Sequence, residues 1–478
     1  MQSSRVSLDE VFSPRGVAVV GASGPGKMSF ASLVLHGLIE AEFPAIYPVN
    51  PKYDEVGGLR CYPDLVSIPG VVDHVVVSIP AESAMALLDE CAAKGVKSVH
   101  FFTAGFGESG FEARAELEQQ MLERARTGGF RIIGPNCVGL FVPKSRVMNV
   151  PGAPLDPGPI AFISQSGGHA QELPADGSLR GLRFSKVVSY GNALDVDESE
   201  LLDYLGRDPE TEIIAAYIEG VKDGRRFLEV LREAAAEKPV VIYKGGRTEA
   251  GKRAVLGHTA SLTSSIGIFE GVCRQTNSIQ VESVDEMIDA LVTLRFVRPL
   301  PRGPRVALIG AGGGPSVLAS DEIEKAGLLL PQFSSEVQEE LRSHFTVAGS
   351  IFSNPVDVLA LAAPEGISTA ARILGRAPEI DLIVYHLGFH PITRWGYGRF
   401  ASAEFRESMT ASLIELQEAT GRPVLLALRP PLEVNALSEF LAAQESFVTA
   451  GLPVFHSLRD AAQAMSRIAT WNRARERS

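Results

Sequence analysis

The chain has 478 residues, of which 45% are hydrophobic and 21% are charged, and its formal net charge is −12. This length predicts about two to four globular domains, each with its own core, and the composition is not that of a disordered chain. The acidic balance argues against a nucleic-acid partner, which would need a clustered basic face. No apolar leader or run of about 18 apolar residues is evident, so we expect a cytoplasmic protein outside the membrane.

Residues 1–149 predict a Rossmann-like domain, here called the first block. Short β-branched runs alternate in this block with helix-like stretches such as ESAMALLDECAAKG. The alternation is typical of a parallel sheet wrapped by helices. The five runs are GVAVVGAS (16–23), AIYPVN (45–50), HVVVSIP (74–80), SVHFFTAG (98–105) and FRIIGPN (130–136).

The first run ends in a glycine-rich turn from Gly21 to Gly26 that contains Ser23. A turn between a strand and a helix presents backbone N–H groups to an anion, so phosphate is its natural ligand; a tight turn without a ligand is the alternative. An NAD site would carry an acid at the end of the second strand. That run instead ends PVNPK, and Lys52 suits a nucleotide with an additional phosphate, such as CoA or NADP. A solvated loop lysine is the alternative.

Two further blocks follow, at 150–300 and 301–478, and both predict flavodoxin-like doubly wound domains. The Pro/Gly-rich linker VPGAPLDPGP opens the second block, and the cluster RPLPRGPR (298–305) precedes the third. Ligands bind parallel sheets of this kind at the carboxyl ends of the strands. The basic tail at 472–478 is predicted to be frayed. The runs are IAFISQS, FSKVVSYGN, EIIAAYIEG and PVVIYKGG in the second block and VALIGAGGG, IDLIVYHLGF, PVLLALRPP and LPVF in the third.

The four cysteines lie far apart in the sequence, without a C-x-x-C pair or a histidine at ligand spacing. Such spacing suggests neither a zinc site nor a disulfide framework, so we predict buried thiols and no metal site. The residues are Cys61, Cys91, Cys137 and Cys273.

A polar turn, Ser164-Gln165-Ser166-Gly167-Gly168, follows the strand IAFI. Its hydroxyls and turn amides suit a phosphate group. The pattern is near the G-x-S-x-G elbow of hydrolases, but Ser164 stands where the first glycine should be, which disfavours a hydrolase. His169 beside the turn would be placed for a base, although a histidine at a helix start is more often a cap-region residue.

A second histidine, His258, lies between small residues in GHTAS, where a short loop would let it swing. A neutral imidazole is nucleophilic near pH 7 and can carry a phosphoryl group; a structural histidine is the alternative. Such a histidine needs an orienting carboxylate, and Glu219 at the end of AAYIEG is a candidate. Glu219 would otherwise cap the next helix, and Glu249 is a candidate cap for the helix after YKGG.

These motifs together resemble the alpha subunit of ADP-forming acetyl-CoA synthetases, relatives of the succinyl-CoA synthetase alpha subunit, over nearly the full length. The resemblance implies CoA and a small carboxylic acid as substrates. It rests on VAVVGAS, YPVNPKY, FTAGFGESG, IIGPNCVGL, ISQSGG, FSKVVSYGNALDVDESELLDYLGRDPETEIIAAYIEG, YKGGRTEAGKRAVLGHTAS and NPVDVL.

The resemblance also assigns roles to individual residues. The catalytic residues would be His258, as the phosphorylated histidine, Glu219, as the acid that holds it, and Ser166. The CoA-binding residues would be Gly21, Ser23, Gly26, Lys52, Pro80 and Asn136. The phosphate-binding residues would be Ser164, Gln165 and Gly167.

The implied reaction has three reversible steps: thioester phosphorolysis to an acyl phosphate, phosphoryl transfer to His258, and transfer from the histidine to ADP. Positioning and charge neutralisation dominate such transfers. ATP or ADP with Mg²⁺ would bind an ATP-grasp domain. We expect that domain on a separate beta subunit, in an αβ or α2β2 complex, because no chain for it follows residue 478.

Three departures from the family pattern keep other functions open. Ala260 stands where a glycine is usual, and residues 26–30 and 167–178 (GGHAQELPADGS) replace the usual small-residue and apolar helix segments. The last two departures lie beside the acyl site, so acetate is not the predicted acid. The alternatives are a non-catalytic CoA or acyl-CoA sensor and an acyl or carbamoyl transferase that needs no histidine relay.

Overall fold

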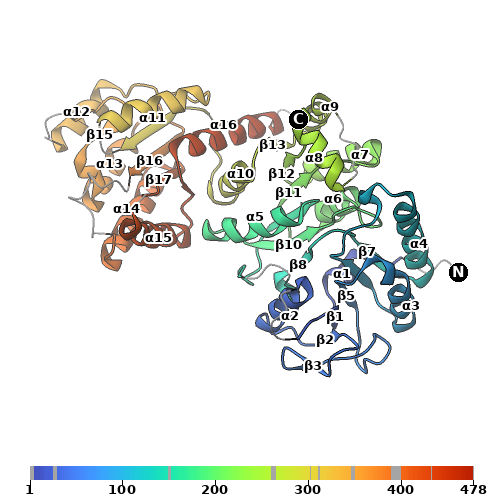
Figure 1. Ribbon diagram of the computed structural model, residues 1–478. Helices are drawn as coiled ribbons and strands as arrows, with labels where there is room; N and C mark the ends of the chain where they lie inside the picture. The colour runs from blue at the N-terminus through green and yellow to red at the C-terminus, as the bar shows by residue number, and fades with distance from the viewer. Residues whose placement is uncertain are drawn as a thin grey trace. The chain divides into compact units, whose positions relative to one another are not determined.

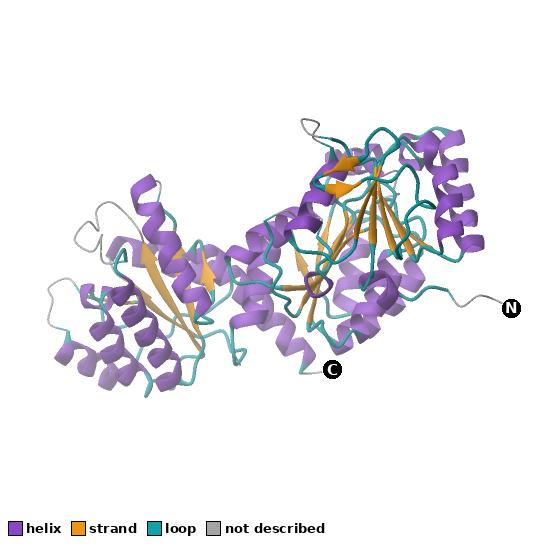
Figure 2. Cartoon of the chain, turned by 90° about the horizontal axis from the view of Figure 1, so that it is seen from below, coloured by secondary structure: helices purple, strands orange, loops and turns teal. Residues whose placement is uncertain are grey.

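The computed structural model describes residues 5–24, 29–148, 152–259, 265–301, 303–310, 313–345, 350–388, 400–431 and 433–476. The chain forms two compact units, Met1–Ser178 with Arg183–Val284, and Leu179–Leu182 with Asp285–Ser478. In each unit helices enclose the strands (Figures 1 and 2), which confirms the predicted α/β class. The first two predicted blocks thus fall almost entirely within one unit, and the division into three domains stays a prediction.

The first sheet holds all five predicted runs of the first block as parallel strands, in the order β2-β1-β5-β6-β7. Counted along the chain this is the doubly wound order 2-1-3-4-5, whose ligand crevice lies where the strand order reverses, between β1 and β5. The strands are β1 (Val17–Val20), β2 (Ile46–Val49), β5 (His74–Val77), β6 (Ser98–Phe101) and β7 (Arg131–Ile133), with a ribbon of β3 (Glu55–Val56) and β4 (Leu59–Arg60). The helices are α1 (Leu8–Phe12), α2 (Phe30–Glu40), η1 (Ala81–Ser83), α3 (Ala84–Lys94), η2 (Gly107–Ser109) and α4 (Glu112–Gly128).

The second sheet has the order β13-β12-β11-β9-β10-β8, and only β8 runs antiparallel to its neighbour. Its parallel part repeats the doubly wound order, with the switch point between β9 and β11. The strands are β8 (Gly139–Phe141), β9 (Ile160–Ser164), β10 (Phe184–Ser189), β11 (Ile213–Ile218), β12 (Val240–Lys244) and β13 (Ile279–Val281). The helices are η3 (Pro143–Ser145), α5 (Gly167–Leu179), α6 (Glu198–Arg207), α7 (Gly224–Glu237), α8 (Glu249–Thr259) and α9 (Ile266–Gln275).

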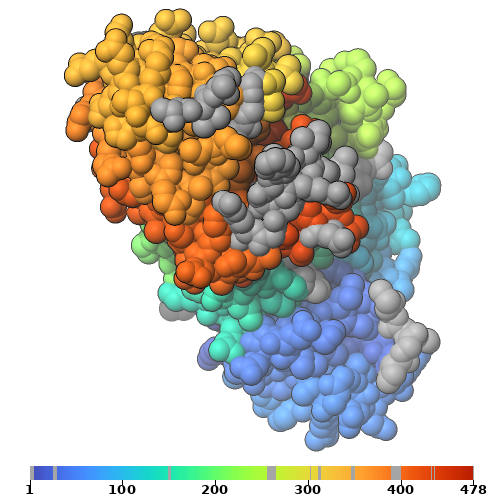
Figure 3. Space-filling view, turned by 90° about the vertical axis from the view of Figure 1, so that its left-hand side faces the viewer, coloured from blue at the N-terminus to red at the C-terminus, as the bar shows by residue number. Residues whose placement is uncertain are grey.

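One hydrophobic cluster runs through both sheets of the first unit. It includes Val17 of β1, Ile133 of β7, Leu140 of β8 and Ile163 of β9, all almost completely buried. All six residues of β11 are buried, as expected for a parallel strand covered on both faces. On the surface the first block adjoins the residues that follow it, blue against teal in Figure 3. The shared cluster explains why the two blocks form one compact unit.

A buried ion-pair group also joins the two sheets. The side chain of Arg131 is 2% exposed. Its Nε donates to Asp195 at 2.8 Å, and its two terminal nitrogens donate to the Glu200 carboxylate at 2.9 and 2.7 Å. Arg131 begins β7 and Glu200 lies in α6, so this group links the first sheet to a helix of the second. Such a two-pronged pair fixes geometry as well as charge.

The second unit holds a third parallel sheet, ordered β15-β14-β16-β17-β18, which is again 2-1-3-4-5 along the chain. The flavodoxin-like plan predicted for the second and third blocks is therefore confirmed. The strands are β14 (Val306–Gly310), β15 (Val356–Asp357), β16 (Leu382–Gly388), β17 (Val424–Arg429) and β18 (Val454–Phe455). The helices are α10 (Val284–Phe296), α11 (Gly313–Lys325), α12 (Ser335–His344), η4 (Leu359–Ala362), α13 (Pro364–Leu374), α14 (Ala403–Thr420), α15 (Val434–Thr449) and α16 (Leu458–Arg475).

Two smaller predictions have clear outcomes. The prediction of a frayed tail was wrong as far as Arg475, because α16 continues to that residue and buries Ile468 and Trp471. The four cysteines are all buried free thiols, as predicted. Among the described helices, none has both the length and the apolar character needed to cross a membrane.

Candidate functional site

The glycine turn lies at the switch point of the first sheet. Gly21 has a φ of +91°, and a Cβ there would clash with the main-chain oxygen of Ser78 at the end of β5. Only glycine allows this approach. The Asn50 side chain donates to the Ala22 oxygen at 2.7 Å and accepts from the Lys52 nitrogen at 3.1 Å. Asn50 thereby joins the end of the second strand to the glycine turn and sets the exposed Lys52 beside it.

The loops after β5, β6 and β7 are joined by hydrogen bonds at the same edge. The Asn136 nitrogen donates to the Thr103 oxygen at 3.1 Å, and the Thr103 hydroxyl donates to the Ile79 oxygen at 2.6 Å. Pro80 is exposed immediately after Ile79, and Ser23 is half-buried in the glycine turn. The structure therefore collects the predicted CoA-binding residues that it describes along one edge of the first sheet.

The turn after β9 is held by its own side chains. The buried Ser164 hydroxyl donates to the Ser166 oxygen at 2.7 Å and accepts from the Ser166 nitrogen at 3.1 Å. The Ser166 hydroxyl in turn accepts from the His169 nitrogen at 3.3 Å, which caps α5. A Cβ on Gly167 would lie 2.9 Å from Val138, so the turn also packs closely against the first block. Ser164 shapes the turn, and the start of α5 offers N–H groups to an anion.

Gln165 connects this turn to the predicted orienting carboxylate. Its side-chain oxygen accepts hydrogen bonds from the main-chain nitrogens of Glu219, a short contact, and of Gly220, at 2.9 Å. Gln165 and Glu219 are both buried, and the Tyr217 hydroxyl donates to the Glu219 carboxylate at 3.3 Å. Because β9 and β11 are neighbours, the predicted phosphate turn and Glu219 meet at the switch point of the second sheet.

Lys244 is a residue of the site that the sequence reasoning did not single out. Its side chain is 1% exposed, and its ammonium group donates to the main-chain oxygens of Glu219 at 2.7 Å and Gly245 at 2.5 Å. Burial lowers the pKa of Lys244 to about 8. A Cβ on Gly245 would clash with the Tyr217 hydroxyl, so this glycine makes room for the group around Glu219. A cation that ends a buried strand was the signal in the sequence.

The capping alternative for Glu219 is excluded by its surroundings, since α7 is capped by the side chain of Asp223. The prediction that Glu249 caps α8 was wrong. The Thr248 hydroxyl accepts from the Gly251 nitrogen at 3.0 Å, and the exposed Glu249 pairs with Lys252 at 2.6 Å. Thr248 precedes the helix and so occupies the cap position first.

His169 lies at the start of α5, and its ring lies beside Tyr217 and Tyr243. Its ring meets the Tyr217 ring edge-on, with centroids 4.5 Å apart, and the Tyr243 ring is 6.1 Å away. Its Nδ1 lies 2.9 Å from the Glu172 carboxylate. The expectation of a cap-region residue holds for the main chain of His169, whose nitrogen donates to Ser166. Its imidazole instead belongs to the aromatic group at the carboxyl ends of β11 and β12.

The backbone of His258 lies in the last turn of α8, where the sequence had suggested a short loop. Its side chain lies outside what the structure describes, as do Gly26 and Ala260 entirely. Helix α8 packs against η2 of the first block. The segment that carries His258 therefore lies in the same unit as both sheets with predicted site residues.

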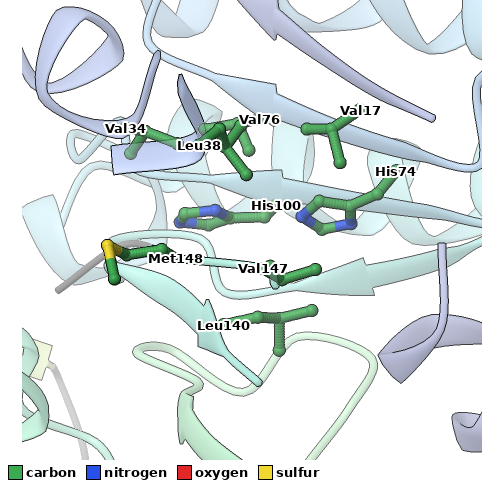
Figure 4. Close-up of a pocket in the computed structure, with 9 residues that line it drawn as sticks. All are labelled: Val17, Val34, Leu38, His74, Val76, His100, Leu140, Val147 and Met148. Carbon is green, nitrogen blue, oxygen red and sulfur yellow. The ribbon is translucent and has the colours of Figure 1, made fainter. Parts of the chain in front are cut away.

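Two other histidines are structural. His74 and His100 line a cavity of about 10 Å³, room for no more than one water molecule (Figure 4). Their rings are nearly parallel, with centroids 6.2 Å apart, and bond to the Ser98 hydroxyl at 2.7 Å and the Cys137 oxygen at 2.9 Å, respectively. Burial lowers the pKa of His74 to about 3 and that of His100 to about 4, so both are neutral at physiological pH.

Comparison with known proteins agrees with this architecture. Residues 15–143 match a CoA binding domain, and residues 157–294 match a succinyl-CoA ligase like flavodoxin domain. The chain is 40% identical over 378 residues to the alpha subunit of acetate–CoA ligase [ADP-forming] II of Pyrococcus furiosus. The aligned region covers 79% of this chain and 81% of that subunit. The chain belongs to the ADP-forming acetate–CoA ligase family.

Members of this ligase family differ in length. The chain is 36% identical to acetate–CoA ligase [ADP-forming] I of Archaeoglobus fulgidus over 79% of this chain, but spans only 54% of that relative. A solved family structure, the dinucleotide-forming acetyl-coenzyme A synthetase 1 of Candidatus Korarchaeum cryptofilum in complex with phosphate and ADP, is 29% identical. The match covers 98% of both chains with a TM-score of 0.79. The first sheet of the present chain thus belongs to a CoA-binding domain.

Proposed function

We propose that the chain is the CoA-binding alpha subunit of an ADP-forming acyl-CoA synthetase. It would interconvert a carboxylic acid, CoA and ATP with an acyl-CoA, ADP and phosphate, through an acyl phosphate and a phosphohistidine at His258. The observation that supports this most is the position of Glu219, whose main chain is held by Gln165 and Lys244 and whose carboxylate accepts from Tyr217. A carboxylate fixed in this way suits the orientation of an imidazole.

The switch points of the two sheets would bind different groups, CoA at the first sheet and the phosphoryl group at the second. In the first sheet, the Gly21 turn offers main-chain N–H groups to a phosphate of CoA, and the exposed Lys52 adds a positive charge. In the second sheet, the start of α5 at Ser166 and Gly167 receives the phosphoryl group of the acyl phosphate. The helix N-terminus favours the charge that develops there.

We place the nucleotide site on a partner chain. ATP or ADP with Mg²⁺ would bind an ATP-grasp beta subunit, in an αβ or α2β2 complex, and His258 would carry the phosphoryl group between the two subunits. A covalent relay of this kind divides one transfer into two steps that each need in-line geometry.

The test is phosphorylation of His258. The full chain is mixed with its ATP-grasp partner, Mg²⁺ and ATP labelled at the γ-phosphate, and we expect acid-labile label on the chain. His258→Asn should carry no label, whereas His36→Asn, at an exposed histidine of α2, should be labelled like the wild type. Equal label on His258→Asn contradicts the proposal.

The alternative of a non-catalytic CoA sensor makes the opposite prediction. It requires CoA binding by the chain without label under any pairing. A CoA titration of the same preparation, run beside the labelling, therefore separates the two functions. A transferase without a histidine relay would instead keep its phosphorolysis activity in His258→Asn.

A further inference from the structure

The segment after the phosphate turn, GGHAQELPADGS, places a polar side chain where the family resemblance leads one to expect an apolar helix. Its histidine, His169, is 29% exposed at the side chain and pairs with Glu172, one turn further along α5. The aromatic group of His169, Tyr217 and Tyr243 contacts Glu219 through the Tyr217 hydroxyl, which donates to its carboxylate at 3.3 Å. None of the steps described above requires His169 or Glu172.

We propose that His169, oriented by Glu172, binds a hydroxyl group of the carboxylic acid substrate. This inference rests on the proposed function and names the class of acid: a hydroxylated carboxylic acid, aliphatic or phenolic. The rings of Tyr217 and Tyr243 would pack against its carbon atoms.

The position of the imidazole supports a role at the acid end of the site. In the second step the acid's carboxylate exchanges the phosphoryl group with the phosphohistidine, which Glu219 would hold. Tyr217 connects the two places, since its hydroxyl bonds to Glu219 at 3.3 Å and its ring contacts His169. An acid whose carboxylate lies at the phosphoryl group thus reaches His169 within a few carbon atoms.

The hydrogen-bonding state of the ring favours a hydroxyl group. Nδ1 is engaged by the Glu172 carboxylate, so Nε2 is the ring nitrogen left for a substrate group, and in the tautomer with Nδ1–H it can accept from a hydroxyl. No protein partner for Nε2 is found among the described residues. An apolar acid would cover this nitrogen without a hydrogen bond, which costs free energy.

The charges around the ring argue against a second carboxylate on the acid. Glu172 and Glu219 both contact the aromatic group, and the buried cation Lys244 directs its ammonium group at two main-chain oxygens. Burial raises the pKa of Tyr217, so its hydroxyl group is uncharged near neutral pH. A dicarboxylate would therefore meet like charges.

The test uses matched acids with the reconstituted pair of subunits. Butyrate, 4-hydroxybutyrate and succinate differ at one end only, and cinnamate and 4-hydroxycinnamate form a second, longer pair. In the wild type we expect kcat/KM for the hydroxylated acid to exceed that of its unsubstituted partner by about 10- to 100-fold in at least one pair, with succinate poor. The partial exposure of the ring keeps the factor below that of a fully buried site.

The variant His169→Leu should reduce that ratio to about 1, because leucine can contact carbon but cannot accept a hydrogen bond. Glu172→Gln should lower the ratio less than His169→Leu does, because the imidazole is still present although its tautomer is no longer fixed by a carboxylate. His36→Leu, at the exposed histidine of α2, is the matched control and should keep the wild-type ratio. An unchanged ratio in His169→Leu, or no preference for a hydroxylated acid in either pair, overturns the proposal.

A binding measurement keeps this inference separate from the proposed function. Isothermal titration of the same five acids into the full chain, wild type and His169→Leu, needs no partner and no turnover. Absence of label on His258 would reject the synthetase function, while loss of the hydroxyl preference in His169→Leu would still support the inference. Equal binding of hydroxylated and unsubstituted acids by the wild type would reject it.

Discussion

The buried ammonium group of Lys244 donates to the main-chain oxygen of Glu219 at 2.7 Å. The carboxylate that would orient the phosphohistidine is therefore positioned from its main chain, by a buried cation on the neighbouring strand β12. A buried amine of this kind titrates in an accessible range, so its contribution is measurable through pH as well as through activity.

Lys244→Met should change how stability depends on pH. The pKa of Lys244 is lowered by burial to about 8, below its unfolded value, so between about pH 8 and 10 the unfolded chain binds more protons and the folded chain gains stability as pH rises. Methionine removes this gain. In urea unfolding at several pH values in this window, the free energy of unfolding of the wild type should rise with pH relative to that of the variant. Parallel pH dependences of the two free energies would contradict the assignment.

In the Lys244→Met variant, His258 should be phosphorylated about 10- to 100-fold more slowly, because Glu219 loses the group that holds its main chain. Lys252→Met, at a solvent-accessible lysine of α8 paired with Glu249, is the control for loss of positive charge near the histidine segment.

Gln165→Leu should disturb Glu219 from the other side. Leucine leaves the main-chain nitrogens of Glu219 and Gly220 without their acceptor, at a cost of about 1–3 kcal/mol each in the free energy of unfolding. Gln165→Glu keeps an acceptor oxygen at this place and should recover most of the stability at acidic pH, where its carboxyl group is protonated and adds no buried charge beside Glu219. Chemical denaturation and His258 labelling of both variants check this, and a stable Gln165→Leu with normal labelling would be inconsistent with it.

Glu198→Gln should stabilise the protein above neutral pH. Burial raises the pKa of Glu198 to about 7, so from about pH 4.5 to 7 the folded state holds a proton that the unfolded state has lost, and stability falls as pH rises. Glutamine avoids this loss, which amounts to about 3 kcal/mol at most. The variant's advantage should appear near pH 8 and vanish near pH 4.5. Glu229→Gln, at an exposed position of α7, should show neither effect.

Arg131→Met should destabilise the first unit by about 3–5 kcal/mol, because it leaves Asp195 and Glu200 without their buried partner. Arg207→Met removes an exposed arginine paired with Asp203 within α6 and should cost less than about 1 kcal/mol. Thermal unfolding of the two variants gives the comparison, and similar losses would show that Arg131 is not essential to the joint between the sheets.

Most strands of the three sheets could be predicted because a parallel strand covered on both faces appears as an uninterrupted apolar run. β11 is such a run in IIAAYI, and every residue is buried. β8, β13 and β15 were not predicted, since strands of two or three residues carry too little pattern. The end of α8 was also missed. The small residues around His258 suggested a loop, but the packing of α8 against η2, which the local sequence does not reveal, accompanies a helix there.

Within the site, the sequence reasoning identified residues with local signals and missed those that depend on pairing between distant strands. The Ser164–Gly168 turn and Glu219 each follow an apolar strand, which is a local pattern. The roles of Lys244 and Tyr217 depend on β11 lying between β9 and β12, an order that the sequence does not state. His169 was noticed but assigned to the helix cap, because its ring contacts on β11 and β12 cannot be derived from its neighbours in sequence.

The antiparallel strand β8 has a consequence for the exchange of modules between family members. It belongs to the first block by sequence, yet it pairs with β10 and covers an edge of the second sheet. A chimera joined at the linker would import a foreign edge strand together with the new CoA-binding part, and a fragment starting at residue 150 would leave β10 open to pairing with another chain. Grafting would therefore have to be done upstream of Gly139, where the recipient keeps its own edge.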